Sequence, residues 1–116
     1  IHPCDGHLLP PFAGWLEAGI DGLAPIDPGA VLSMAAMKAA YGDRLALKGN
    51  IDCVSTLCTG TPDEVREEVR RCIADAGPAG LIVSSSNTIH RGVKPDNYRA
   101  LLEALRTFGT CKEAHV

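Results

Sequence analysis

The sequence predicts an α/β fold of four β/α units in line, equal to the C-terminal half of a TIM (β/α)8 barrel with parallel strands. Short apolar runs alternate with segments whose apolar residues recur at helical spacing, and every run ends in polar residues. The units recur at roughly 25–30 residues, as in a barrel of about 250 residues. The rival fold is a small open doubly wound sheet, but no glycine-rich phosphate loop of the dinucleotide-binding kind follows any predicted strand.

The first two units occupy the first third of the chain. Residues 1–4 predict the end of a strand, and a helix is expected over 8–18. A second short strand is expected over 20–26, followed by a helix that ends near Tyr41. Its predicted inward face consists of Ala30, Met34, Met37 and Tyr41.

The third unit has the clearest helix start. A strand over 45–48 leads into a glycine turn that exposes Asn50 and Asp52. Thr61 is expected to cap the helix together with Glu64, with a proline at the first helical position. The residues predicted to point inward are Val65, Val69, Cys72, Ile73 and Ala76.

The fourth unit begins with the continuous apolar run 81–83, which predicts a parallel strand buried on both faces. A helix is expected from Pro95, and its predicted inward residues are Tyr98, Leu101, Leu102, Leu105 and Phe108. Residues 1–109 are thus expected to form the half barrel, with 110–116 as a tail.

Composition excludes several classes of partner. The net charge of −3 without a basic run argues against nucleic acid, and no apolar stretch approaches the about 20 residues that span a bilayer. The five cysteines form an odd set without paired spacing, which indicates reduced thiols and a cytoplasmic location. The sequence opens at the polar end of a predicted strand and without Met, so we expect a fragment of a longer protein.

Several motifs occur in an order that resembles one known family. They are His2-Pro3-Cys4-Asp5-Gly6, Gly19-Ile20-Asp21-Gly22-Leu23, Pro25-Ile26-Asp27-Pro28-Gly29, Tyr41-Gly42-Asp43-Arg44-Leu45, Gly49-Asn50-Ile51-Asp52, Gly60-Thr61-Pro62-Asp63-Glu64-Val65, Ser84-Ser85-Ser86-Asn87 and Val93-Lys94-Pro95-Asp96-Asn97-Tyr98. Together they resemble the C-terminal part of uroporphyrinogen-decarboxylase-like proteins, up to about residue 109. That superfamily contains the haem-pathway decarboxylase and zinc-dependent, corrinoid-linked methyltransferases, and its fold is a TIM barrel.

The resemblance leaves two reactions open. One is decarboxylation of a tetrapyrrole-like substrate without a metal; the other is methyl transfer to a thiol with a corrinoid protein as partner. Zinc is the cofactor that the second reaction implies, and His2 and Cys4 match the His-x-Cys spacing of its ligands. The family's last-strand cysteine falls at about Asn87, a poor zinc ligand, so Cys53 is the candidate for a third ligand. No cofactor follows from the residues alone.

Polar residues just past the strand ends are the candidate site, because active sites lie on that face of a barrel. Asp52 and Asp5 are the candidate catalytic residues. The candidates for substrate binding are Asn50, Asp27, Ser86, Asn87 and His90. The alternative role for each aspartate is capping of a helix, which we consider less fitting for Asp52 because nine residues separate it from Thr61. We expect His2 and Cys4 beside each other, within reach of Asp52 and the Ser86-Asn87 turn.

The alternative to an enzyme is a non-catalytic half barrel that acts through self-association. On that view the chain lacks the decarboxylase's catalytic aspartate, which the resemblance places near the start of the barrel, and the isolated fragment is inactive. Cys58 and Cys111 carry no assigned role.

Our first prediction concerns assembly. Half a barrel leaves two open strand edges, and inward side chains such as Leu47 and Ile82 have no opposite wall. Burial of each is worth about 1.5–3 kcal/mol, so we expect two copies to pair and close eight strands. Sedimentation at high dilution tests this, since a folded monomer of 12.2 kDa would favour an open α/β sandwich instead.

Overall fold

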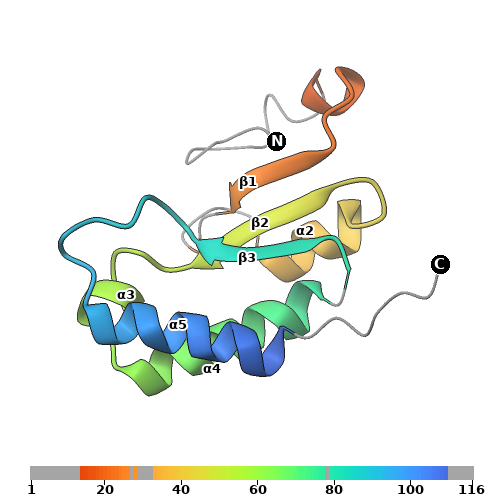
Figure 1. The fold of residues 1–116 in the computed structure, drawn as a ribbon. Coiled ribbons are helices and arrows are strands. Elements are labelled where there is room, and N and C mark those ends of the chain that lie inside the picture. The colour runs from red at the N-terminus through yellow and green to blue at the C-terminus, as the bar shows by residue number, and fades with distance from the viewer. Residues whose placement is uncertain (1–13, 27, 29–32, 78, 110–116) are drawn as a thin grey trace.

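The computed structural model describes residues 14–26, 28, 33–77 and 79–109. Strands β1 (Gly22–Ile26), β2 (Ala46–Ile51) and β3 (Leu81–Ser85) form one parallel sheet in the order β1-β2-β3 (Figure 1). The helices are α2 (Met34–Tyr41), α3 (Thr56–Thr59), α4 (Pro62–Ala76) and α5 (Pro95–Phe108). Across this part of the chain no helix has the length and apolar character that crossing a membrane requires.

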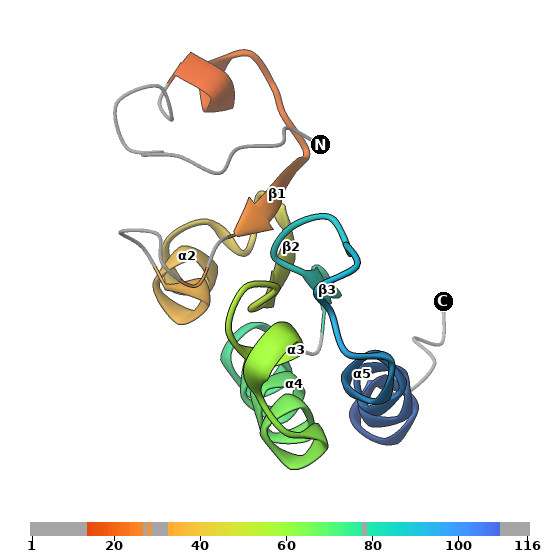
Figure 2. The ribbon, with the colours of Figure 1, turned by 90° about the vertical axis from the view of Figure 1, so that its left-hand side faces the viewer.

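Helices α2 and α4 lie on one face of the sheet, and α5 packs against α4 next to the edge strand β3. Figure 2 shows α2 and α4 along the same side of the strands, while the opposite face carries no helix of the described chain. Strands in chain order with one-sided helices are the winding of a barrel, because a doubly wound sheet reverses its strand order and is covered on both faces. The prediction of parallel β/α units is confirmed for three strands in an open sheet. The strand expected at 1–4 lies outside the described residues.

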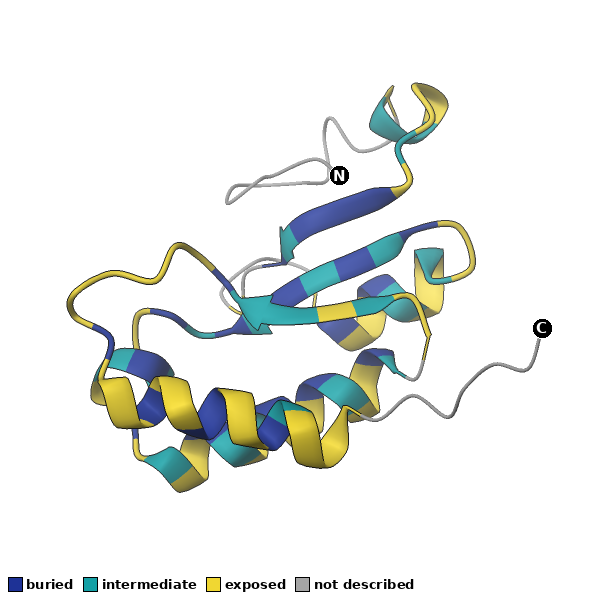
Figure 3. Cartoon of the chain, viewed as in Figure 1, coloured by how far each residue is buried: buried dark blue, intermediate teal, exposed yellow. Residues whose placement is uncertain are grey.

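The central strand β2 fixes which side chains enter the core. Its residues alternate between partly exposed and buried, and Leu47, Gly49 and Ile51 are the buried set (Figure 3). Leu47 and Ile51 belong to the same core cluster as Met37, Val65 and Val69 of the helices. The expectation that Leu47 points toward a barrel interior was therefore wrong, because its face of the strand is the one that the helices cover.

Strand β3 is an edge strand rather than a strand buried on both faces. Ile82 pairs with Lys48 on the helix-free face and is 47% exposed, whereas Leu81 and Val83 pack against the core. The prediction of burial on both faces rested on composition, because residues 81–83 form a continuous apolar run. The described chain supplies neither a fourth strand nor a layer to cover Ile82, which explains the difference.

Helix α4 follows its sequence pattern closely. The Thr61 side chain accepts the amide of Glu64 at 3.3 Å, and the Glu64 carboxylate accepts the amide of Thr61 at 3.0 Å. This capping box satisfies two amides that a helix start leaves free. The predicted inward residues are buried except Ile73, which is partly buried at the edge of the core.

Helix α5 begins at Pro95 as predicted, but the side chains that face the core are different. The buried residues are Asn97, Ala100, Leu101 and Ala104. Of the residues predicted to point inward, Tyr98, Leu102 and Phe108 are 39–40% exposed. Small alanines let α5 approach α4 closely, so the helix is rotated from the orientation that its largest apolar residues suggest.

Several local features differ from the prediction, and β1 begins at Gly22 rather than at residue 20. Strand β2 continues to Ile51 instead of ending at Lys48, so the glycine read as a turn lies within the strand. The short helix α3 was not predicted, because its four residues are too few to show periodicity. Helix α2 buries Met34 and Met37 and ends at Tyr41, as predicted, whereas its cap at Ser33 was not predicted.

Gly49 is the glycine on which strand pairing depends most directly, which leads to our second prediction. Its φ of +143° disfavours other residues, and an added Cβ would lie 2.8 Å from the carbonyl oxygen of Ile26 in β1. We expect Gly49→Ala to lower the free energy of unfolding by about 2 kcal/mol or more in urea titrations. Gly14→Ala is the matched control because an added Cβ there meets nothing within 4 Å. Equal stability of the two variants would contradict this account.

Candidate functional site

The carboxyl ends of β2 and β3 meet at one rim of the sheet. The amide of Ser86 donates to the carbonyl of Ile51 at 2.7 Å, and the amide of Cys53 donates to the Ser86 hydroxyl at 3.1 Å. The loop that holds Asp52 therefore lies beside the turn that holds Asn87. Four candidate residues lie outside the described residues: His2, Cys4, Asp5 and Asp27.

The Asp52 carboxylate is engaged with the backbone that follows it. One carboxylate oxygen accepts the amides of Val54 and Ser55 at 2.8 and 2.9 Å, and the other accepts the Ser55 hydroxyl at 2.7 Å. The Asp52 amide donates to the Glu68 carboxylate at 2.7 Å, which ties the end of β2 to α4. Asp52 thus holds the turn that leads into α3. Its distance from Thr61 had argued against a capping role, but that argument overlooked α3.

The hydrogen bonds also set the charge of Asp52. Burial is the largest influence and raises the pKa of this carboxyl, while the Ser55 hydroxyl and the amides of Ser55 and Val54 lower it. The net effect is a pKa below the ordinary value, because the three donors together outweigh burial. Asp52 is therefore a carboxylate at neutral pH, suited to accepting hydrogen bonds or facing a positive charge rather than donating a proton.

Cys53 is the one zinc candidate in the described chain, and its thiol already makes a hydrogen bond within the protein. Cys53 is buried, and its S–H donates to the carbonyl of Thr88 at 3.3 Å. Burial, followed by the neighbouring Cys58 and Asp52, raises the pKa of this thiol, which disfavours the thiolate that zinc needs. Within the residues described, no three His, Cys, Asp or Glu side chains gather as a metal site. Zinc on His2 and Cys4 stays a prediction.

The helix-free face of the sheet carries a small polar group next to the rim. Asn50 pairs with Ser84, and Lys48 precedes Asn50 by two residues and so lies on the same face. All three are partly exposed. Lys48 and Ser84 were not among the candidates. The alternation of Lys48 with the buried Leu47 and Ile51 is the sequence signal that could have identified Lys48, whereas Ser84 is placed beside it by strand pairing.

Ser86 and Asn87 differ in what they offer to a ligand. Ser86 is buried, and its hydroxyl oxygen accepts a hydrogen bond from the Cys53 amide. Asn87 is exposed, and its side-chain oxygen accepts the amide of Thr88 at 2.7 Å. Ser86 thus connects the two rim loops, while Asn87 presents its amide group at the surface of the turn.

His90 is exposed in the loop after β3 and lies against a cysteine that the sequence did not single out. Its Nε2 is 3.7 Å from the sulfur of Cys58, and its Nδ1 accepts the amide of Gly92 at 3.1 Å. Cys58 and His90 are 32 residues apart, the first in α3 and the second in the loop after β3. No spacing pattern in the sequence connects them, so only the folded chain reveals the contact.

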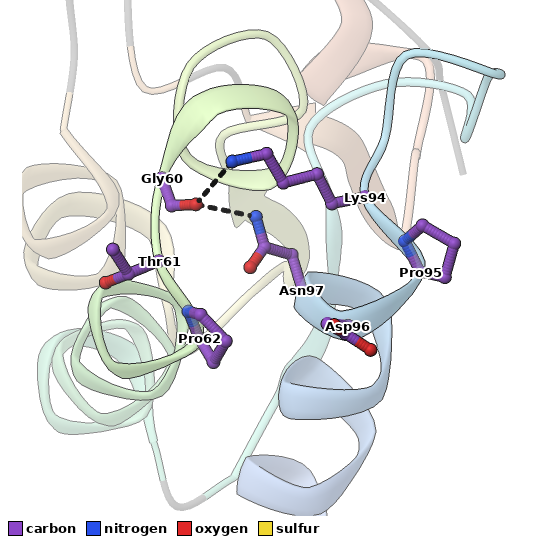
Figure 4. A pocket seen from close by; sticks show the side chains of 7 residues that line it. All are labelled: Gly60, Thr61, Pro62, Lys94, Pro95, Asp96 and Asn97. Atoms are coloured by element: carbon purple, nitrogen blue, oxygen red, sulfur yellow. Dashed lines mark hydrogen bonds between the residues drawn. The ribbon is translucent and has the colours of Figure 1, made fainter.

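A pocket of about 460 Å³ opens between the starts of α4 and α5 (Figure 4). The Asn97 side-chain amide points across it and donates to the carbonyls of Thr56, Leu57 and Gly60 at 3.3, 3.1 and 2.9 Å. Lys94 reaches the same Gly60 carbonyl at 3.5 Å. Asn97 thereby fastens the end of α3 to α5. Prolines at the first position of both helices remove amide donors, so the pocket lacks the backbone cradle of an anion site.

Comparison with known families identifies the chain. The family model described as "Uroporphyrinogen decarboxylase (URO-D)" matches residues 1–108. The chain belongs to the uroporphyrinogen decarboxylase family. This agrees with the resemblance noted in its motifs and with the one-sided winding of its helices.

Curated relatives carry the same description. The chain is 34% identical over 93 residues to "Uroporphyrinogen decarboxylase" of Psychromonas ingrahamii, covering 78% of this chain and 26% of that protein. It is 37% identical over 97 residues to "Uroporphyrinogen decarboxylase" of Alkalilimnicola ehrlichii, covering 78% of this chain and 25% of the relative. The chain therefore spans about a quarter of the length of these relatives.

A solved structure of a methyltransferase from Methanosarcina mazei matches in fold. The TM-score is 0.73 at 22% identity, with 90% of this chain and 30% of that chain covered. At this identity the match establishes the fold alone. The three-stranded sheet with its helices thus corresponds to part of a uroporphyrinogen-decarboxylase-like barrel.

Our third prediction concerns pH and Asp52. The pKa of Asp52 is lower in the folded chain than its ordinary value of 3.8, so its charged form stabilises the fold. This stabilisation is fully present above the unfolded-state pKa and is lost as the pH falls through the folded-state pKa. We expect Asp52→Ala to lower the free energy of unfolding by about 1 kcal/mol at neutral pH and by less at about pH 3. Asp52→Asn keeps one side-chain oxygen that can accept both amides, loses the acceptor for the Ser55 hydroxyl, and should remove the share of acid sensitivity that Asp52 contributes.

Urea unfolding at the two pH values measures these effects. Asp75→Asn, on the exposed side of α4, is the control and should follow the parent chain. If Asp52→Asn lost stability with acid as steeply as the parent, the linkage assigned to Asp52 would be wrong.

Proposed function

We propose that this chain supplies the carboxyl-terminal part of a family barrel that decarboxylates a tetrapyrrole-like substrate rich in carboxylates. The single observation that carries the proposal is the polar group of Lys48, Asn50 and Ser84 on the helix-free face of the sheet, next to the rim. In a closed barrel of this winding that face is the interior. A lysine there offers a cation to a substrate carboxylate, and Asn50 offers both a donor and an acceptor.

The other residues of the rim take supporting roles in this proposal. The Asp52 carboxylate orients the substrate or faces positive charge that develops on it. Asn87 and His90 contact the substrate from the turn and the loop after β3. Ser86 holds the two loops in register through Cys53. Asp5 and Asp27 stay candidates for catalysis and binding, with no geometry described for either.

Two observations favour decarboxylation over corrinoid-linked methyl transfer. The curated relatives that match at 34% and 37% identity are described as decarboxylases. Asn87 stands where a zinc-binding cysteine is expected, and the thiol of Cys53 is buried against Thr88. Methyl transfer to a thiol, with zinc on His2 and Cys4, is the alternative that the match to a methyltransferase fold keeps in view.

The uncovered apolar surface supports a role within a larger assembly. Ile82 on the edge strand and Tyr98, Leu102 and Phe108 on α5 are all 39–47% exposed. Association with the rest of a barrel or with a second copy would cover these side chains. In the non-catalytic alternative, a half barrel that self-associates, a second copy of the chain covers these side chains.

Our fourth prediction tests the activity in a chimera. We would replace the matching quarter of the Alkalilimnicola ehrlichii relative with this chain and assay decarboxylation of uroporphyrinogen. We expect activity that persists in the presence of a chelator. Lys48→Met should raise KM about tenfold or more, because a hydrogen bond to a charged group is worth about 1.5–3 kcal/mol.

The control is Arg71→Met, an exposed cation on α4 that lies on the helix side of the sheet. It should leave KM unchanged. A folded chimera without decarboxylase activity would refute the proposal. Stoichiometric zinc together with methyl transfer from a methylcorrinoid to a thiol would establish the alternative.

A further inference from the structure

The sulfur of Cys58 on α3 makes two contacts, one with an imidazole and one with a backbone carbonyl. Its sulfur lies 3.7 Å from His90 Nε2, and its S–H donates to the carbonyl of Cys53 at 3.0 Å. Cys58 is partly exposed and His90 is exposed, so small molecules in solvent can reach the pair. The proposed decarboxylation does not use this thiol.

The hydrogen bond from the Gly92 amide determines which nitrogen of the His90 ring carries the hydrogen. Because the Gly92 amide donates to Nδ1 at 3.1 Å, that nitrogen is unprotonated, and the neutral ring carries its hydrogen on Nε2. The ring therefore presents an N–H to the Cys58 sulfur. An N–H donor stabilises negative charge on sulfur, and the thiolate is the nucleophilic form of cysteine. His90 acts here as a hydrogen-bond donor rather than as a base.

Gly92 also fixes the position of the ring. A Cβ at Gly92 would lie 2.7 Å from Cε1 and 2.9 Å from Nδ1 of His90, and 3.6 Å from the Cys58 sulfur. Gly92 does not have a positive φ, so its backbone tolerates alanine although the ring does not. Gly92→Ala is thus a way to displace the imidazole while leaving it in the protein.

The other two described cysteines lack these features. All three thiols donate to a backbone carbonyl, but Cys53 and Cys72 are buried, whereas Cys58 is partly exposed. The Asn50 backbone also makes a hydrogen bond to the Cys72 thiol, but that thiol is buried. Of the three, Cys58 alone combines access from solvent with a donor directed at its sulfur.

We propose that Cys58 is a nucleophilic thiol that forms mixed disulfides with low-molecular-weight disulfides, with His90 and Gly92 as positioning residues. The Cys58 thiolate attacks one sulfur of the small disulfide, and a new S–S bond forms as the original S–S bond breaks. The second half of the small molecule leaves as a thiolate and takes up the proton that Cys58 gave to solvent. The small disulfide is the oxidant, so the exchange balances without another reagent.

Our fifth prediction tests this site on the full chain with Cys4→Ser and Cys111→Ser, which remove the two cysteines outside the described residues. Glutathione disulfide is added, and the adducts are located by fragmentation of tryptic peptides. This step is needed because residues 49–66 form one peptide that contains both Cys53 and Cys58. We expect adducts at Cys58 at least about tenfold faster than at Cys53 or Cys72, and equal rates at all three in urea.

The positioning role is tested by variants around the ring. His90→Leu and Gly92→Ala should each slow modification of Cys58 about threefold or more, because the first removes the imidazole N–H from the sulfur and the second displaces it. His90→Gln retains a side-chain N–H and should recover part of the rate. Gly14→Ala is the matched control and should not change it.

Two results would overturn the proposal. One is equal modification of Cys58, Cys53 and Cys72 in the absence of urea. The other is an unchanged Cys58 rate in both His90→Leu and Gly92→Ala, which would show that exposure alone accounts for reactivity. Neither outcome depends on decarboxylase activity, so this site stands or falls separately from the proposed function.

Discussion

The alternation of strand β2 is the constraint on which the rest of the structure depends. Leu47, Gly49 and Ile51 face the helices and join their core, so Lys48 and Asn50 face the other way. Since β2 pairs with both neighbours, its register decides which residues of β1 and β3 lie on each face. A shift by one residue would bury Lys48 under α4 and expose Leu47. The separation of core from polar face thus rests on one strand.

The rim above this strand is built largely from polar side chains that bind backbone. Asp52 holds the turn before α3, Ser86 joins the loops after β2 and β3, and Asn97 fastens α3 to α5. These bonds are local or buried, where an unsatisfied group would be costly. A rim residue can therefore be essential to activity because it shapes the loops. Substitutions at Asp52 or Ser86 need a stability measurement beside any assay.

Membership of the uroporphyrinogen decarboxylase family accounts for the surfaces that the described chain leaves uncovered. The chain spans about a quarter of its curated relatives, and a sheet of three strands has two edges where a closed barrel has none. The exposed Ile82 and the apolar side chains on the outside of α5 adjoin such a boundary. Their exposure explains why burial predicted from composition failed at β3 and α5 but held at α4, which lies between α2 and α5.

The sequence by itself determined the elements that rest on local physics. The capping box of Thr61 and Glu64, Pro95 at the start of α5 and the alternation of β and α segments all depend on residues close together in the chain. The motifs also indicated the family. Tertiary structure alone decided which face of α5 packs, that Asp52 serves α3, and that Cys58 meets His90 across 32 residues. Those outcomes depend on which distant segments become neighbours, and a single sequence carries no periodic signal for that.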